Sequence, residues 1–431
     1  MTFEVRGECS FEETAALVTG FVACVACVSC VADALEKVAA GVTLLPAEQV
    51  ALPDALGRVL AQDVASTLTH PPTAVSAMDG YAVRWDDLAT IPGTLTVIGE
   101  SAAGHAFDGA ISAGQATRIF TGAAVPEGAD TIVIQEDTER NGDRVTVTMK
   151  PNKQGEFVRP AGLDFSEGEV LLHAGHVVTA RGVGLAAAMN VPWLMVRRRP
   201  RIAYVATGDE VVMPGQPVAP GQIISSNSLA LAAYITAMGG EPVSLGIAKD
   251  TPESLAETLA GARGADMLVT MGGASVGDHD LVQQVLGGRG FELDFYKIAM
   301  RPGKPLIFGH IDGTPMLGLP GNPVSTGVTS ALFLRAAFTK MLGLTDEPTE
   351  AMATLGADLP ANGKREDYMR AQMAPGPDGR IIATAFPRQD SAMLADFTRA
   401  NCLIIRAPHA ESATAGEQVR ILPLGFGMQR F

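Results

Sequence analysis

Beyond residue 200, apolar runs of strand length alternate with segments of helical length. Runs such as RIAYVAT (201–207) and ADMLVTMGG (265–273) are apolar almost throughout, and the helical pattern of 228–240 lies between them. Near-continuous apolar strands that alternate with helices are typical of a parallel sheet covered on both faces. The sequence therefore predicts a doubly wound, mostly parallel α/β domain at 197–342, whose ligands would bind beyond the carboxyl ends of the strands.

The patterns in the rest of the sequence predict a multidomain protein that combines the α/β domain with β-rich domains. Residues 67–150 contain glycine-punctuated apolar runs that alternate at period two, with an NGD hairpin signal, and indicate an inserted β-rich domain. Residues 343–431 are similar and indicate a small C-terminal β-barrel. The remaining parts are a discontinuous helical and extended linker domain at residues 31–66 and 151–196 and an N-terminal extension at residues 1–30.

The first part of the chain combines helical patterns with clustered cysteines. Apolar residues recur at helical spacing in 31–41, which ends in a glycine, and in 52–64. The near-repeat VACVACVSC (22–30) suits either a metal or iron–sulfur site, for which no fourth ligand lies nearby, or the small-residue face of an apolar helix. The apolar stretch 20–34 is too short to span a membrane, and the acidic residues before it do not suit a signal peptide.

The composition bounds the partners that this chain can have. Its formal net charge is −15, with lysines and arginines scattered along the sequence, which argues against binding to nucleic acid or to an anionic membrane. An anionic ligand must therefore meet local cations or backbone donors. The cysteines do not form a secreted disulfide framework, so we expect a cytoplasmic protein.

Polar residues follow the predicted strands of the α/β domain at one edge of the sheet. The turn MGGASVGDHD combines glycines, which suit an anion, with aspartates, which repel an anion unless a cation lies between them. Backbone N–H groups of Gly272 and Gly273, with the Ser275 hydroxyl, would form an anion-binding nest. Cationic side chains would add further donors for the anion, and carboxylates would hold Mg²⁺ against the phosphates of the ligand. The cations are Lys297, Arg301 and Lys304, and the carboxylates are Glu210, Asp250 and Asp280.

Several of these features also have a purely structural explanation. A GGxS turn is commonly structural, Asp250 suits the cap of the following helix, and Asp280 suits a helix N-terminus. The convergence of many such residues on one sheet edge is what favours a site.

Further motifs leave the same alternatives open. In LPGNPVS, Pro320 and Pro323 bracket Gly321 and Asn322, either as a tight turn or as a rigid loop that shapes a pocket wall. Two motifs of the inserted domain contain Asp79 and Thr121, whose side chains could take part in catalysis. The acidic residue–glycine pairs in the same motifs are, however, also ordinary turn signals.

Six motifs, in order along the chain, carry a family resemblance: SAMDGYAV, TGAAVPEGADTIV, VATGDE, MGGASVGDHD, RPGKPLIFG and LPGNPVS. Together they resemble the molybdopterin molybdenumtransferase family, also called molybdenum insertases, to which the E domain of gephyrin also belongs. The resemblance covers about residues 31–430. It implies Mg²⁺-dependent insertion of molybdate into adenylylated molybdopterin, with release of AMP. It also implies an elongated homodimer in which the inserted domain of the partner helps to close the cleft.

The resemblance implies roles for the residues that match the motifs. Molybdopterin adenylyltransferase and recipient molybdoenzymes are the further partners that it suggests. For catalysis it implies Asp79, Thr121, Glu210, Asp250 and Asp280, of which Asp250 and Asp280 would bind the metal. For the substrate pocket it implies Arg159, Lys297, Lys304, Pro320, Pro323 and Ser325.

Three positions depart from the family pattern. Leu163 precedes Asp164 where an acidic pair is common, Ser225 stands where many members have aspartate, and Val75 stands where many have asparagine. The principal acidic residues are retained, so we expect an enzyme. The alternatives are a catalytically altered paralogue that serves as a molybdopterin-binding carrier or scaffold, and a different nucleotide hydrolase at the same sheet edge.

Overall fold

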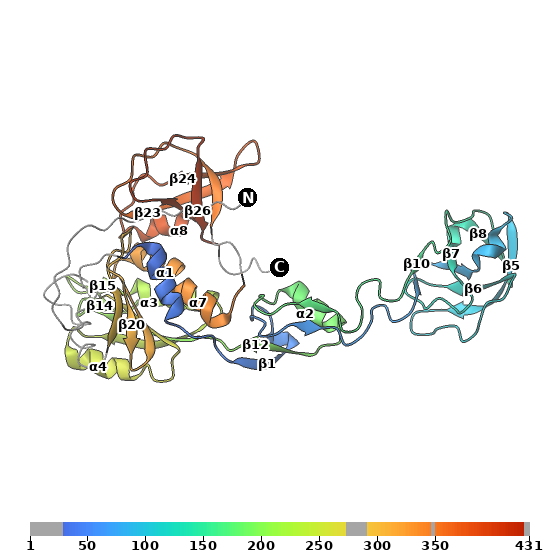
Figure 1. Ribbon diagram of the computed structural model, residues 1–431, viewed down its shortest axis with the longest axis horizontal. Helices are drawn as coiled ribbons and strands as arrows, with labels where there is room; N and C mark the ends of the chain where they lie inside the picture. The colour runs from blue at the N-terminus through green and yellow to red at the C-terminus, as the bar shows by residue number, and fades with distance from the viewer. Residues whose placement is uncertain (1–28, 273–290, 346–349, 426–431) are drawn as a thin grey trace, which may run out of the picture.

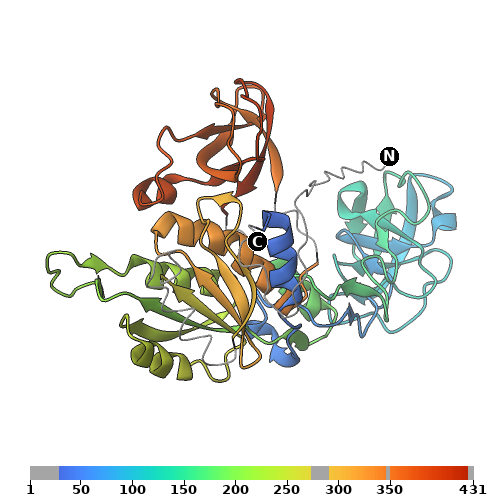
Figure 2. The ribbon, with the colours of Figure 1, turned by 60° about the vertical axis from the view of Figure 1, so that its left-hand side comes forward.

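The computed structural model describes residues 29–272, 291–345 and 350–425 and shows an elongated molecule (Figure 1). An α/β domain and a C-terminal barrel lie together at one end, and an inserted β domain lies at the other. A small linker domain joins the two ends, and Figure 2 shows the same separation from another direction. The inserted domain therefore lies apart from the α/β domain of its own chain.

The α/β domain is built on a six-stranded sheet in the order β16-β13-β17-β21-β20-β18. The first four strands in this order are mutually parallel, whereas β20 and β18 each run antiparallel to the preceding neighbour. The doubly wound, mostly parallel fold is thus confirmed. The strands are β13 (Arg201–Thr207), β16 (Glu241–Ala248), β17 (Met267–Met271), β18 (Glu292–Tyr296), β20 (Ile307–Ile311) and β21 (Thr314–Leu319).

The antiparallel direction of β20 follows from the turn that joins it to β21. Only Asp312 and Gly313 separate the two strands, and both have positive φ, at 48° and 77°. A two-residue turn of this kind makes a hairpin and cannot connect parallel strands. The antiparallel direction of β20 affects the site, because it brings the start of β20, rather than its end, to the edge at which the parallel strands end.

The central strands bury both of their faces. Ile202 and Tyr204 pack into one core, whereas Ala203 and Val205 pack into another that includes Leu255 of α4. Helices therefore cover the sheet on two sides, as Figure 1 shows. The helices of the domain are α1 (Val31–Ala40), α3 (Ser226–Ala237), α4 (Pro252–Ala260), α6 (Pro323–Thr329) and α7 (Arg335–Leu342), with π-helical residues Ser330–Leu334 between the last two.

The N-terminal helix belongs to this core. The sequence placed residues 31–66 in the linker domain, but Ala34 and Val38 of α1 pack in the same core as α7. Cys30 caps the helix, since its Sγ accepts a hydrogen bond from the Asp33 N–H at 3.4 Å. Cys24 and Cys27 lie outside the described residues. Of the helices that the structure describes, none has the length and hydropathy to cross a membrane.

The linker domain is a small assembly of two strand pairs and a helix. The predicted helix at 52–64 is wrong, because only Leu52–Asp54 forms a 3₁₀ turn before Gly57 adopts φ +75°. Val59 and Leu60 instead make isolated bridges to distant segments. The elements are β1 (Ala47–Ala51) with β12 (Trp193–Arg197), β2 (Val64–Ala65) with β11 (Val170–Leu172), and α2 (Ala180–Ala188).

The inserted domain is a six-stranded sheet in the order β7-β4-β6-β5-β9-β8. The NGD hairpin is confirmed, since Asn141 pairs with Arg144 across a two-residue turn. A two-stranded neck, β3 (Val75–Ser76) with β10 (Val158–Arg159), leads into it. The sheet strands are β4 (Gly80–Val83), β5 (Gly93–Ser101), β6 (Gln115–Ile119), β7 (Thr131–Ile134), β8 (Thr138–Asn141) and β9 (Arg144–Val147).

The C-terminal domain is a closed barrel, as predicted. Its strand order is β23-β24-β22-β26-β25, and a pairing between β23 and β25 closes it. The short strand β19 (Met300–Arg301) of the α/β domain adds to β23. The barrel contains β22 (Ala351–Leu355), β23 (Glu366–Pro375), β24 (Ile381–Ala385), β25 (Cys402–Arg406), β26 (Gln418–Pro423) and helix α8 (Leu394–Arg399).

Replacing Phe308 with alanine should strongly destabilise the α/β domain. The Phe308 side chain is 0% exposed, and its ring stacks on Phe295 with centroids 5.9 Å apart. Removing such a ring leaves a cavity and costs about 3–5 kcal/mol. Amide hydrogen exchange of peptides from β13, β17 and β20 in increasing urea measures this loss.

Leu229→Ala is the control for that substitution. Leu229 lies on α3 of the same domain and is 52% exposed, so its truncation should change stability by no more than about 0.5 kcal/mol. Equal losses of protection in the two variants would contradict the assignment of Phe308 to a packed core.

Candidate functional site

A cavity of about 870 Å³ opens at the edge where the parallel strands end. It lies beyond the carboxyl ends of β13, β16, β17 and β21, as expected for a sheet of this topology. Many of the residues expected at the site contribute to its wall. These are Glu210, Asp250, Gly272, Lys297, Lys304, Pro320, Gly321, Asn322, Pro323 and Ser325.

The two lysines reach this edge because of the antiparallel strands. Lys297 follows β18, as the sequence suggested. Lys304 was also expected after a strand, but it precedes β20. Since β18 and β20 are antiparallel neighbours, the end of one strand and the start of the other meet at the same edge. The Ile298 N–H donates to the Lys304 carbonyl at 3.0 Å and closes the loop between them. Two cations are thereby placed side by side in the cavity wall.

The acidic side of the cavity comes from the ends of β13 and β16. Gly208 adopts φ +138°, a backbone conformation that residues with a Cβ rarely adopt, so glycine is favoured there. The Asp250 N–H donates to Asp209 Oδ1 at 3.3 Å. Burial raises the pKa of the Asp250 carboxyl, and the nearby charges of Asp209 and Glu210 raise it further, against the lowering effect of the Asp209 backbone N–H. The sheet thus gathers negative charge opposite the two lysines.

This acidic group suits a divalent cation only in combination with a ligand. Within the described ranges, no group of three or more histidine, cysteine or acidic residues has the geometry to hold a metal ion. Mg²⁺, however, commonly takes one or two carboxylates and completes its shell with phosphate oxygens and water. Burial, and then repulsion by Asp209 and Glu210, raise the pKa of Asp250, and a bound cation would offset both effects, so Asp250 beside Glu210 fits this role.

Asn227 holds the proline-bracketed loop and was missed by the sequence reasoning. Its Nδ2 donates to the Gly321 carbonyl at 2.6 Å, and Thr326 Oγ1 donates to the Pro320 carbonyl at 2.6 Å. Asn227 also lines the cavity. Its position in the first turn of α3, just after the short strand β15 (Ile223–Ile224), was the available signal. That strand pairs with β14 (Val211–Val212), and neither was predicted.

Ser225, one of the departures from the family pattern, is buried beside the cavity. Its Oγ lies 2.7 Å from Oγ of Ser228, so the two hydroxyls share a hydrogen bond. A serine in this position adds no charge to the cavity wall.

The Gly272 N–H, one of the donors expected in the anion nest, is used elsewhere. The Gly272 N–H donates to the Leu319 carbonyl at 3.2 Å and so extends the pairing of β17 with β21. Its donor is used within the sheet, although Gly272 still lines the cavity. Gly273, Ser275 and Asp280 lie outside the described residues.

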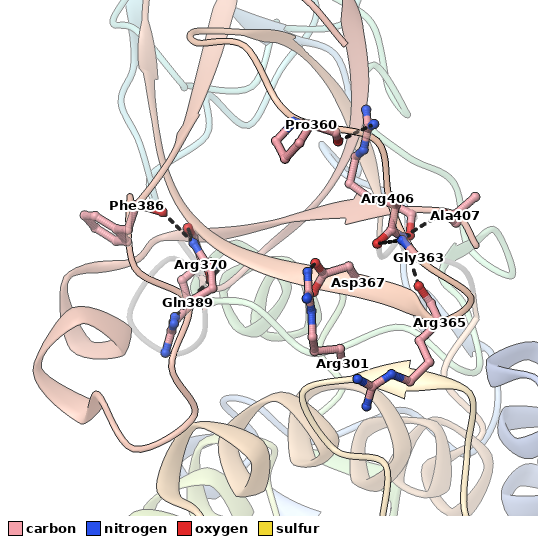
Figure 3. Close-up of polar contacts among 11 residues, drawn as sticks. Arg301, Pro360, Gly363, Arg365, Asp367, Arg370, Phe386, Gln389, Arg406 and Ala407 are labelled. Carbon is pink, nitrogen blue, oxygen red and sulfur yellow. Dashed lines mark hydrogen bonds and ion pairs between the residues drawn. The ribbon is translucent and has the colours of Figure 1, made fainter. Parts of the chain in front are cut away.

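Arg301 does not line the cavity. It lies on β19, and its guanidinium forms an ion pair with Asp367 of the C-terminal barrel (Figure 3). The sequence grouped Arg301 with Lys297 and Lys304 because only a few residues separate them. The pairing of β19 with β23 turns the side chain to a different partner.

Asp79 and Thr121 meet in the inserted domain, away from the cavity of the same chain. The Thr121 N–H and Oγ1 each donate to Asp79 Oδ1 at 2.8 Å, and these bonds lower the pKa of the Asp79 carboxyl. The following Gly80 must be glycine, because a Cβ there would lie 2.0 Å from the Val133 carbonyl oxygen. Arg159 is exposed on the neck strand β10 of the same region. The structure therefore gathers two separate groups of candidate residues.

Family models match the chain in three successive regions. The MoeA N-terminal region, described as domains I and II, matches residues 30–190. A probable molybdopterin-binding domain matches residues 203–340, which contain most of the cavity wall. The MoeA C-terminal region, described as domain IV, matches residues 352–424.

Curated proteins and solved structures are similar along most of the chain. The molybdopterin molybdenumtransferase of Nostoc sp. is 39% identical, over 85% of this chain and 86% of its own length. That of Haemophilus influenzae is 32% identical, over 87% and 93% respectively. The crystal structure of a molybdopterin biosynthesis MoeA protein from Pyrococcus horikoshii covers 93% of this chain, with a TM-score of 0.80 and 30% identity. The chain therefore belongs to the molybdopterin molybdenumtransferase family, which its motifs resemble.

Proposed function

We propose that this protein catalyses the molybdenum-insertion step of molybdenum cofactor biosynthesis. It would bind adenylylated molybdopterin and molybdate, and would release AMP. One observation carries the proposal: Lys297, Lys304, Glu210 and Asp250 come from distant parts of the chain and line a single cavity. Family membership over most of the chain narrows the class of ligand to a molybdopterin derivative.

The lysine side of the cavity would bind the anionic parts of the substrates. Lys297 and Lys304 are compact positive charges that suit phosphate or molybdate oxygens. A cavity of about 870 Å³ falls in the size range of sites for small organic ligands and cofactors. The loop 320–325, fixed by Asn227, forms a rigid wall that orients the ligand.

The acidic side would act on the phosphates. Mg²⁺ held by Asp250 would neutralise charge on the phosphate oxygens. Asp280, which lies outside the described residues, remains our second proposed metal ligand with Asp250. Glu210 would also orient water toward the phosphoanhydride bond that is broken when AMP leaves. The chain would thus act by positioning and charge neutralisation, without a covalent nucleophile.

A second copy of the chain would complete the site. Asp79 and Thr121 form a hydrogen-bonded pair, and their domain lies apart from the α/β domain of their own chain. In a homodimer, the inserted domain of the partner subunit would bring this pair and Arg159 to the cleft. The enzyme would work in the cytoplasm, with molybdopterin adenylyltransferase before it and recipient molybdoenzymes after it.

A molybdopterin-binding carrier or scaffold is the second candidate function. Ser225 favours it, since its hydroxyl is shared with Ser228 and supplies no carboxylate to the cavity. A carrier would bind adenylylated molybdopterin without releasing AMP, whereas the enzyme forms AMP and active cofactor in the presence of molybdate and Mg²⁺.

Asp250→Asn should lower the rate of AMP release by about 100-fold, because it removes a proposed metal ligand and its charge. Chromatography of AMP and reconstitution of an apo-molybdoenzyme measure the two products. Glu257→Gln is the control, since Glu257 is an exposed acidic residue on the neighbouring α4 and should keep wild-type activity. An Asp250→Asn variant that forms AMP at the wild-type rate would exclude this role.

Co-expression of two inactive variants tests the shared site. Chains with Asp79→Asn and chains with Asp250→Asn should together recover about a quarter of wild-type activity, because half of the dimers are mixed and each has one intact site. The co-expressed mixture gives this value, whereas mixed dimers purified through two affinity tags contain one intact site of two and should show about half of wild-type activity.

A matched pair of variants controls for this experiment. Glu210→Gln with Asp250→Asn should recover nothing, since both residues belong to the same cavity wall and every site keeps one defect. Recovery by this control pair, or none by the first pair, would contradict the proposed exchange between subunits.

A further inference from the structure

The C-terminal barrel contacts the loop that carries the two cavity lysines. β19 lies within this loop, residues 297–306, and pairs with β23 of the barrel in the register Arg301 to Asp367. The Glu366 N–H also donates to the Ala299 carbonyl at 2.9 Å. A segment of the α/β domain thereby becomes an additional strand beside the barrel.

A partly buried ion pair reinforces this contact. The Asp367 side chain is 5% exposed, whereas that of Arg301 is 52% exposed (Figure 3). In the part of the chain that the structure describes, Arg301 is the cation that pairs with this carboxylate. The same pairing raises the pKa of Arg301. A buried carboxylate that loses its partner is costly, so the pair holds the loop to the barrel.

The barrel also contacts the other wall of the cavity. Asn322 Nδ2 donates to Ser391 Oγ at 3.0 Å, and the Val324 N–H donates to the Ser391 carbonyl at 3.1 Å. Phe397 of α8 packs on Gly327, where a Cβ would lie 2.2 Å from its ring. Both the lysine loop and the proline-bracketed loop are therefore attached to a domain that contributes no side chain to the cavity among those described.

The lysine loop needs such an external attachment because its own conformation is unfavourable. Lys297 has φ +74°, in the left-handed region that non-glycine residues avoid, whereas Gly303 tolerates its φ of +110° because it lacks a Cβ. Surrounding structure must hold a backbone of this kind in place. The strand pairing and the ion pair lie between these two residues and provide that restraint.

We propose that Arg301 and Asp367 are positioning residues, through which the C-terminal barrel fixes Lys297 and Lys304 and so sets the affinity of the cavity for its anionic ligand. The proposal rests on the function proposed above in one respect, the anionic nature of the ligand. The barrel then acts on ligand binding without touching the ligand.

Arg301→Gln is the central variant, since it leaves the Asp367 carboxylate buried without its partner. We expect faster amide hydrogen exchange in residues 297–306 and a KM for molybdate raised at least about tenfold, with kcat changed by less than about twofold. Arg301→Lys keeps the positive charge and should recover most of the wild-type KM. Combining Arg301→Gln with Asp367→Asn should do less harm than Arg301→Gln alone, because a neutral amide needs no cation.

Two controls separate positioning from general destabilisation. Asp378→Asn removes an exposed ion pair with Arg380 in the same barrel, so it should change neither loop exchange nor KM. Ser391→Ala loosens the second attachment and should raise KM without speeding exchange in residues 297–306. It also tests the role of the barrel if Arg301→Gln fails to fold.

The proposal is overturned if exchange in residues 297–306 and KM stay at wild-type values in the folded Arg301→Gln variant. It is also overturned if Arg301→Lys is as impaired as Arg301→Gln. The loop exchange is measured without substrate, so it decides the positioning role by itself. A wild-type protein that releases no AMP, but whose loop exchange responds as expected, would refute only the proposed function.

Discussion

Burial of both faces of the central sheet is the constraint on which the rest of the structure depends. Ile202 and Tyr204 face one core and Ala203 and Val205 face the other, so the interior of β13 has no room for a charged side chain. In β13, β17 and β21, charged groups are confined to positions at or beyond the strand ends, and parallel alignment brings those ends to one edge. The cavity, its carboxylates and its loops are consequences of that arrangement.

The reversal of one strand, β20, gives this edge its mixed charge. Glu210 and Asp250 follow parallel strands, whereas Lys297 and Lys304 arrive through the antiparallel pair β18 and β20. In a chain with a net charge of −15, these lysines provide positive charge locally. Carboxylates and ammonium groups therefore line one cavity, which is what the proposed anionic, metal-bound ligand would require.

Much of the site was predictable because residues that follow a buried strand must lie at its end. Glu210, Asp250 and the loop 320–325 were placed by this reasoning alone. Arg301 was not, although it is close in sequence to Lys297 and Lys304, because β19 pairs with a barrel strand more than sixty residues away. The N–H of Gly272 was expected to face a ligand but continues a strand ladder instead. Asn227 escaped notice because its role lies in a contact with Gly321, almost a hundred residues further along the chain.

Local sequence patterns specify the α/β alternation, the inserted and C-terminal β domains, the hairpin at residues 141–143 and the family, since periodicity and turn residues are local properties. Long-range packing, in contrast, places α1 in the α/β core, makes the segment after Leu52–Asp54 form strand bridges rather than a helix, and brings Arg301 to Asp367. The physical reason is the same in each case. A pattern of burial specifies that a face must be covered, but the segment that covers it is selected by packing and charge between residues that are distant in the chain.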